Sequence, residues 1–134
     1  MGSKVDIMDA KQHDHILSIT SHMPHLIAYN IVNTTLNVQD KKESDIVKYS
    51  AGGLRDFTRI AASNPIMWRD VFIQNKKNIS NMIDNFITNL EELKKAIENK
   101  DGKKLEEIFT KTKKIRKEII EAGQDVGRPD FGRK

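Results

Sequence analysis

The stretch ISNMIDNFITNLEELKKAIENKDGKKLEEIFTKTKKIRKEI, residues 79–119, decides the fold. On each side of a short polar segment, residues recur at alternating steps of four and three, as helix-packing residues do. These rows are Ile79, Ile83, Phe86, Leu90, Leu93 and Ile97, and then Leu105, Ile108, Thr112, Ile115 and Ile119. Asn99-Lys100-Asp101-Gly102 between the rows has the composition of a tight turn. The stretch therefore predicts two long helices that form an antiparallel hairpin.

The chain before this hairpin also shows helical spacing. We expect a first helix over about residues 10–36, a short helix over 44–51 that stops at Gly52-Gly53, and a further helical segment over 54–62. Asn64-Pro65 is a helix start, with Asn64 as the cap and Pro65 in the first turn, and one long helix should run from there into the hairpin. No strand pattern is long enough to trust, so the predicted fold class is all-α.

Composition excludes several classes of function. The 134 residues suffice for one domain but are few for an enzyme that carries its own cofactor. The chain lacks cysteine, a signal-like N-terminus and any apolar run of about 18 residues, so we expect a cytoplasmic protein with no membrane partner. The basic and acidic residues are interspersed, which argues against nucleic acid as a partner.

Ser21-His22-Met23-Pro24-His25 interrupts the first predicted helix. Proline inside a helix removes a backbone donor and clashes with the carbonyl four residues earlier, at a cost of about 3 kcal/mol. We therefore expect a bend at Pro24, where His22 and His25 lie three residues apart on neighbouring positions. A tolerated kink with two structurally ordinary histidines explains this pattern as well when it is taken alone.

Two further stretches carry residues suited to binding. In Gly52-Gly53-Leu54-Arg55-Asp56-Phe57-Thr58-Arg59, Asp56 and Arg59 are three residues apart and can touch, and an arginine fork suits a carboxylate or phosphate. An exposed ion pair beside a helix stop is an equally good reading. Trp68, the one tryptophan, fits either a core or an interface position.

Taken together, three motifs resemble one family. They are Ser21-His22-Met23-Pro24-His25, Gly52-Gly53-Leu54-Arg55-Asp56-Phe57-Thr58-Arg59-Ile60-Ala61 and Asn64-Pro65-Ile66-Met67-Trp68-Arg69-Asp70. In this order they resemble the C-terminal helical domain of prephenate, arogenate and cyclohexadienyl dehydrogenases. The resemblance covers the chain from about Met8 to the tail. It implies a dimerisation domain similar to the C-terminal domain of 6-phosphogluconate dehydrogenase, with a kinked first helix and a long antiparallel hairpin.

The resemblance also implies roles for individual residues. Arg59 would pair with a substrate carboxylate and His25 would contact the substrate side chain, while Ser21 and His22 line the same pocket. Asp56 would govern access or hold the neighbouring arginine, Gly52 would allow close backbone approach, and Trp68 would reach across the dimer toward the partner's site. The implied reaction is the oxidative decarboxylation of prephenate, or of arogenate, in tyrosine biosynthesis, with hydride transfer to NAD or NADP.

In such enzymes the cofactor and the catalytic histidine belong to an N-terminal Rossmann domain, which we do not find in this sequence. We therefore expect no catalytic residue in this chain and no turnover by it alone, as for one part of a larger or split enzyme. A noncatalytic helical dimerisation or adaptor module is the alternative. We expect no metal, because His13, His15, His22 and His25 are badly spaced for tetrahedral zinc.

Overall fold

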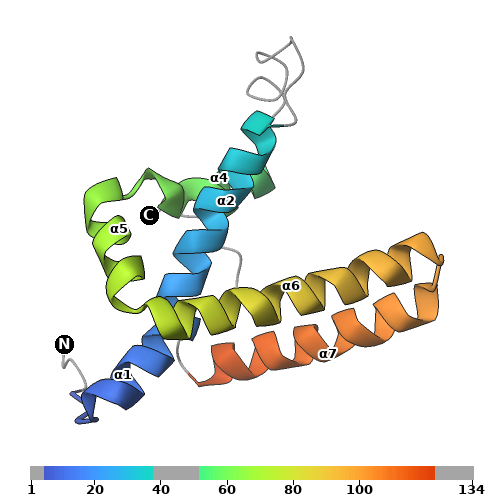
Figure 1. The fold of residues 1–134 in the computed structure, drawn as a ribbon. Coiled ribbons are helices and arrows are strands. Elements are labelled where there is room, and N and C mark those ends of the chain that lie inside the picture. The colour runs from blue at the N-terminus through green and yellow to red at the C-terminus, as the bar shows by residue number, and fades with distance from the viewer. Residues whose placement is uncertain (1–4, 38–51, 123–134) are drawn as a thin grey trace. The chain divides into compact units, whose positions relative to one another are not determined.

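The computed structural model describes residues 5–37 and 52–122, and every regular element in these ranges is helical. The chain divides into two compact units, residues 1–84 and 85–134. The elements are α1 (Ala10–Leu17), a π-helical turn (Ser18–His22), α2 (Met23–Asn37), α4 (Gly52–Thr58), a 3₁₀ turn (Arg59–Ala62), α5 (Pro65–Gln74), α6 (Lys76–Glu98) and α7 (Gly102–Glu121) (Figure 1). The predicted all-α fold is confirmed. No helix in the described ranges is both long and apolar enough to span a membrane.

A π-helical turn explains how the first helix tolerates Pro24. The backbone N–H of Met23 donates to the carbonyl of Ser18, five residues earlier, instead of to the residue four earlier. This wider turn comes directly before the proline, where a regular α-helix would set the ring against the carbonyl of Thr20. The predicted bend is therefore a local change of helix type between α1 and α2. The Asp9 side chain caps α1 by accepting from the backbone N–H of Gln12 at 2.8 Å.

The segment after the first helix packs back onto α2. Both α4 and the 3₁₀ turn contact α2. The Tyr29 hydroxyl on α2 donates to the carbonyl of Ser63 at 2.9 Å, and Ala28 beside it is fully buried. Gly52 and Gly53 form the first turn of α4, so the prediction that they end a helix is wrong at these two residues. The helix predicted over 44–51 lies outside the described residues.

The helix that begins at Asn64-Pro65 is shorter than predicted. The Asn64 side chain accepts from the backbone N–H groups of Ile66 and Met67, as expected of a cap. The helix ends at Gln74, because Asn75 adopts a non-helical φ of −102° and ψ of 31° before α6 begins. The single long helix expected from residue 65 into the hairpin is therefore two helices, α5 and α6.

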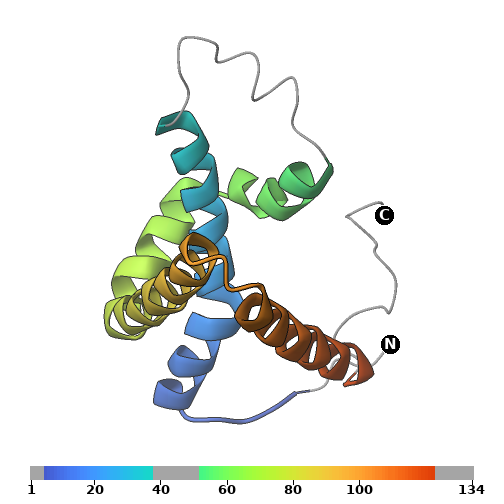
Figure 2. The same cartoon turned by 90° about the vertical axis from the view of Figure 1, so that its right-hand side faces the viewer.

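The second unit contains the predicted antiparallel hairpin. Residues 85–98 of α6 and all of α7 are joined by a tight turn, in which Lys100 has a φ of 53°. The Asp101 side chain caps α7 by accepting from the backbone N–H of Lys104, and an ion pair of 3.1 Å joins Lys104 to Glu92. Figure 2 shows the two helices leaving this turn in different directions.

The predicted apolar seam of the hairpin is only partly buried. Ala96, which is not a member of the predicted row, is 4% exposed near the turn. Four seam members are substantially exposed, namely Leu90, Ile97, Ile115 and Ile119. Because the helices diverge, these side chains are not covered within the unit. The apolar rows of α6 and α7 therefore remain partly exposed in the described structure.

Candidate functional site

The two motif histidines meet Trp68 in the first unit. His25 stacks on the indole, with ring centroids 3.8 Å apart and an interplanar angle of 21°. His22 approaches the same indole edge-on, with centroids 6.1 Å apart and an angle of 80°. Phe72, one turn further along α5, extends the cluster at 5.4 Å from Trp68. The bend at Pro24 and the start of α5 thus bring together motifs that are more than forty residues apart in sequence.

Trp68 carries a polar group that nothing in the described part of the chain satisfies. The residue is 8% exposed, and its indole N–H is buried without a hydrogen-bond acceptor. A buried donor without a partner costs about 1–3 kcal/mol, and such groups in native structures call for a specific explanation. An acceptor atom of a bound molecule would satisfy it.

The backbone and an asparagine hold the two imidazoles. Nδ1 of His25 donates to the carbonyl of Ser21 at 2.8 Å, which places a proton on Nδ1. The Asn75 amide nitrogen lies 3.1 Å from Nδ1 of His22 and also donates to the carbonyl of Asp14 at 2.8 Å. The Ser21 side chain is partly buried beside these groups.

Burial controls the charge of His22. Loss of solvent lowers the pKa of His22 below its ordinary value of 6.5, and the positive fields of His13 and His25 act in the same direction. The Asp14 carboxylate opposes this shift but does not reverse it. His22 is therefore a neutral imidazole at pH 7 and interacts through hydrogen bonds.

Arg59 begins the 3₁₀ turn that packs on α2, the helix that carries His25. The arginine is exposed, and within the described ranges its guanidinium forms no hydrogen bond or ion pair. The predicted contact between Asp56 and Arg59 is likewise absent among these residues. Thr58 lies between them with a φ of −90° and a ψ of 0°, where α4 ends and the 3₁₀ turn begins, so Asp56 and Arg59 do not share one continuous α-helix. The guanidinium thus remains available to an external anion.

The structure describes the surroundings of two further site residues, Gly52 and Trp68. A Cβ built on Gly52 would meet no atom within 4 Å, so the close backbone approach expected there stays a prediction. Trp68 is buried against His22 and His25 of its own chain, and its expected reach toward a partner also stays a prediction. The hydrogen bonds at Ser63 and Asn75, on either side of α5, hold this helix against the histidines.

Asn75 lies outside the three sequence motifs, which do not single it out. It is 9% exposed, and its side chain takes part in three hydrogen bonds, the third accepted from the Asn78 amide at 2.9 Å. In the sequence Asn75 lies inside what reads as one long helix, so no signal marks it. Nothing in the sequence points to its contact with His22.

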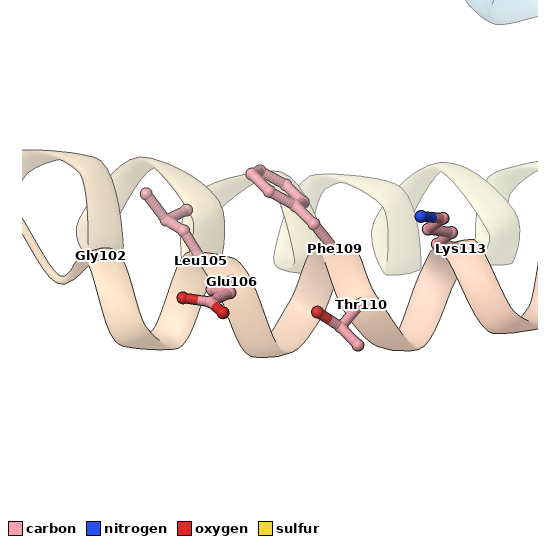
Figure 3. Close-up of a pocket in the computed structure, with 6 residues that line it drawn as sticks. All are labelled: Gly102, Leu105, Glu106, Phe109, Thr110 and Lys113. Atoms are coloured by element: carbon pink, nitrogen blue, oxygen red, sulfur yellow. The ribbon is translucent and has the colours of Figure 1, made fainter.

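Two hollows on the surface of the second unit are unrelated to these motifs. One of about 440 Å³ lies along α7 and is lined by Gly102, Leu105, Glu106, Phe109, Thr110 and Lys113. Figure 3 shows Leu105 and Phe109 projecting in the same direction, while Glu106 and Thr110 point to the other side of the helix. The second hollow lies on the same helix between charged residues such as Lys103 and Glu107. Because each is lined by one helix alone, neither encloses a ligand.

Comparison with known proteins identifies the family. The family model for the dimerization domain of prephenate dehydrogenase matches residues 9–111. The chain belongs to the prephenate dehydrogenase family. The family resemblance given by the three motifs is thus confirmed, and the matched residues include every candidate site residue of the dimerization domain.

Relatives and solved structures agree with this assignment. The chain is 40% identical to the cyclohexadienyl dehydrogenase of Zymomonas mobilis over 87% of its own length and 40% of the relative's. It is 34% identical to the prephenate dehydrogenase of Bacillus subtilis, over 81% of this chain and 29% of that one. The crystal structure of Aquifex aeolicus prephenate dehydrogenase with hydroxyphenyl propionate and NAD⁺ superposes with a TM-score of 0.81, at 39% identity, over 88% of this chain and 41% of that one. The chain thus spans less than half the length of these proteins.

The described part of the dimerization domain offers no place for a dinucleotide. Such sites use a glycine-rich turn between a strand and a helix, and the described ranges hold no strand, while Gly52 and Gly53 lie within a helix. Nor do three histidine, aspartate or glutamate side chains gather there closely enough to hold a metal. The candidate site residues in the described part of the domain are therefore two imidazoles, an indole and a guanidinium.

Proposed function

We propose that this chain is the dimerisation and substrate-binding part of a prephenate or arogenate dehydrogenase. The whole enzyme oxidatively decarboxylates its substrate with hydride transfer to NAD⁺ or NADP⁺, and for prephenate the product is 4-hydroxyphenylpyruvate. One observation carries the proposal: His22, His25 and Trp68 form a single cluster, and Arg59, unpaired among the described residues, lies on the 3₁₀ turn that packs against α2, the helix of His25.

The chemistry of these groups suits a carboxylate substrate with a polar ring. A guanidinium binds a carboxylate through two parallel hydrogen bonds and fixes its orientation as well as its charge. The two imidazoles and the unsatisfied Trp68 indole N–H offer directional hydrogen bonds next to an aromatic surface. These groups can bind and orient the substrate, and none of them accepts a hydride.

The redox step therefore belongs to a dinucleotide-binding domain outside the residues described. The Aquifex aeolicus protein, which was solved with NAD⁺, supports this division because this chain matches only 41% of it. We infer that Ser21, His22, His25 and Arg59 form the part of the substrate site that the helical domain supplies, with Trp68 supporting the histidines.

We further propose that the domain forms a homodimer. The family description names a dimerization domain, and α6 carries a row of exposed apolar side chains formed by Ile87, Leu90 and Ile97. Ile66, Met67 and Ile73 on α5 and Phe109 on α7 are also about half exposed or more. A row of exposed apolar side chains on one helix, as on α6, fits an interface.

Calorimetric titration of the 134-residue chain with prephenate and with arogenate tests the substrate proposal. We expect one of them to bind, and Arg59→Ala to weaken the binding about 10- to 100-fold, the usual worth of hydrogen bonds to a charged group. Arg69→Ala is the matched control, since Arg69 is an exposed arginine already paired with Asp70 at 2.9 Å.

The control should leave the affinity unchanged. Equal affinities for the unsubstituted chain and Arg59→Ala would contradict the proposed role of Arg59. No binding of either compound, together with a stable dimer, would instead favour the noncatalytic dimerisation module.

A further inference from the structure

We propose that Asn75 is a positioning residue that holds His22 in the tautomer with its proton on Nε2, so that His22 meets the substrate as a hydrogen-bond donor. The role of His22 toward substrate rests on the proposed function. The tautomer of His22 is independent of the proposed function, because it is fixed by hydrogen bonds within the first unit.

The orientation of the Asn75 amide follows from its partners. The backbone carbonyl of Asp14 can only accept a hydrogen bond, so the group 2.8 Å from it must be the Asn75 nitrogen. The Asn75 oxygen then faces the Asn78 amide nitrogen at 2.9 Å, which donates to it. If the amide were reversed, the Asn75 oxygen would face the carbonyl oxygen of Asp14, and the Asn75 nitrogen would face the amide nitrogen of Asn78.

The tautomer of His22 follows from that orientation. The Asn75 nitrogen has two protons, one of which goes to Asp14, and it has no accepting lone pair. Nδ1 of His22, at 3.1 Å, must therefore be the acceptor for the second proton. A neutral imidazole whose Nδ1 is an acceptor carries its own proton on Nε2.

The neighbouring histidine has the opposite arrangement. Nδ1 of His25 donates to the Ser21 carbonyl, so the Nε2 of a neutral His25 is an acceptor. No hydrogen bond to either Nε2 occurs within the described ranges. The cluster therefore offers one donor, on His22, and one acceptor, on His25. A substrate carboxylate or carbonyl oxygen suits the first, and a hydroxyl group suits the second.

The groups that face His22 keep it neutral. Asp14 and His13 come from α1 and His25 from α2, while α5 presents the uncharged edge of Trp68. Burial and the two histidines together outweigh the Asp14 carboxylate and lower the pKa of His22. If Nδ1 of His22 were protonated, its N–H would face the N–H of the Asn75 amide, and the hydrogen bond between them would be lost.

Nitrogen NMR of the imidazole rings, recorded without ligand at pH 8.5, tests this inference on the unsubstituted chain. A nitrogen without a proton resonates well downfield of one that carries a proton, so the two tautomers are distinguished directly. We expect His22 to show an unprotonated Nδ1 and His25 an unprotonated Nε2. A protonated Nδ1 on His22 would overturn the inference without any variant being needed.

The variant Asn75→Asp provides a second test, with the tautomer and the pKa of His22 as the measured properties. The new carboxylate can only accept, so we expect it to move the His22 proton to Nδ1 and to raise the pKa of His22. Asn81→Asp is the control, since it adds the same charge at an exposed position on α6 and should change neither property. An unchanged His22 tautomer in a folded Asn75→Asp chain would also overturn the inference.

Substrate affinity separates this inference from the proposed function. At pH 8.5 we expect Asn75→Asp to bind prephenate or arogenate about tenfold more weakly than the control, because Nε2 of His22 no longer donates. An unchanged affinity, with the tautomer moved, would overturn the donor role of His22. If the unsubstituted chain binds neither compound while showing the expected tautomers, the proposed function fails and the positioning of His22 by Asn75 stands.

Discussion

The two units of this chain use helices in opposite ways. In the first unit the regular helices are interrupted near the candidate site residues: by a π-helical turn before Pro24, by a 3₁₀ turn at Arg59 and by a break at Asn75. In the second unit two uninterrupted helices are joined by a capped turn, and the ion pairs are exposed. Irregular backbone thus accompanies the polar cluster, and regular helices accompany the uncovered apolar rows. We therefore expect the first unit to bind the small molecule and the second to bind another helix surface.

The largest effect should come from placing charge on the apolar row of the second unit. Leu90→Glu combined with Ile97→Glu should weaken self-association at least about 1000-fold, since two central apolar contacts are each replaced by a buried charge. Sedimentation across a range of concentrations measures this. Both side chains are exposed in the single chain, so the helical content should not change.

Lys95→Glu is the matched control for this prediction. Lys95 is exposed and lies five residues after Leu90, on a different side of α6. A control variant that dissociates as readily as the double variant would show that net charge, and not the apolar row, governs association.

The next largest effect should come from the aromatic cluster of the first unit. Trp68→Ala should lower the free energy of unfolding by about 3 kcal/mol, because it removes a buried indole and its stack on His25. Urea denaturation measures the loss, with Gln74→Ala, an exposed residue of the same helix, as the control. A loss below about 1 kcal/mol would mean that the cluster does not hold α5 in place.

Each unit contains a helix cap that can be removed by a single substitution, so the caps at Asn64 and Asp101 allow the units to be compared directly. Asn64→Ala and Asp101→Ala should each cost about 1 kcal/mol, since each removes the side-chain acceptor of a helix start. Asn64→Asp and Asp101→Asn retain the acceptor and serve as controls. Only Asn64→Ala should also shift the Trp68 indole resonance in NMR spectra, because α5 carries that ring. An equal shift from Asp101→Ala would contradict the separation of the two units.

The smallest effect concerns pH. The pKa of His22 is lowered on folding, so the unfolded chain takes up a proton below pH 6.5 that the folded chain does not bind until lower pH. The stability due to the neutral imidazole is therefore complete above pH 6.5 and declines as the pH falls. The unsubstituted chain should lose more stability between pH 7.5 and pH 5 than His22→Gln does, as measured by urea denaturation at both pH values. Equal losses would contradict the effect of burial on His22.

The sequence was sufficient for the parts of the fold that depend on local signals. The cap at Asn64 depends on a side chain that bonds to a backbone N–H three residues away, and the polar segment 99–102 joins the two helices as predicted. The break at Asn75 could not be predicted, because it is stabilised by bonds to Asp14 and His22, which lie 61 and 53 residues away in sequence. The exposure of Leu90 and Ile97 was also not predictable, since the spacing of apolar residues does not indicate whether they pack within the chain or stay exposed.

The candidate site shows the same division. The three motifs selected His22, His25 and Trp68, which the fold brings together, but the expected contact between Asp56 and Arg59 was not found among the described residues. Trp68 lies against the histidines of its own chain, and Asp56 forms no ion pair with Arg59 within the described ranges. Both outcomes depend on tertiary packing and on a local change of helix type, which residue spacing alone does not report.

NMR titration of the 134-residue chain with prephenate and with arogenate tests most directly whether the irregular unit is the binding unit. One of the two compounds should shift the Trp68 indole N–H and the ring signals of His22 and His25, and leave the resonances of α7 unchanged. Shifts confined to α7, or no shifts with either compound, would show that this cluster of imidazoles and indole does not bind the substrate.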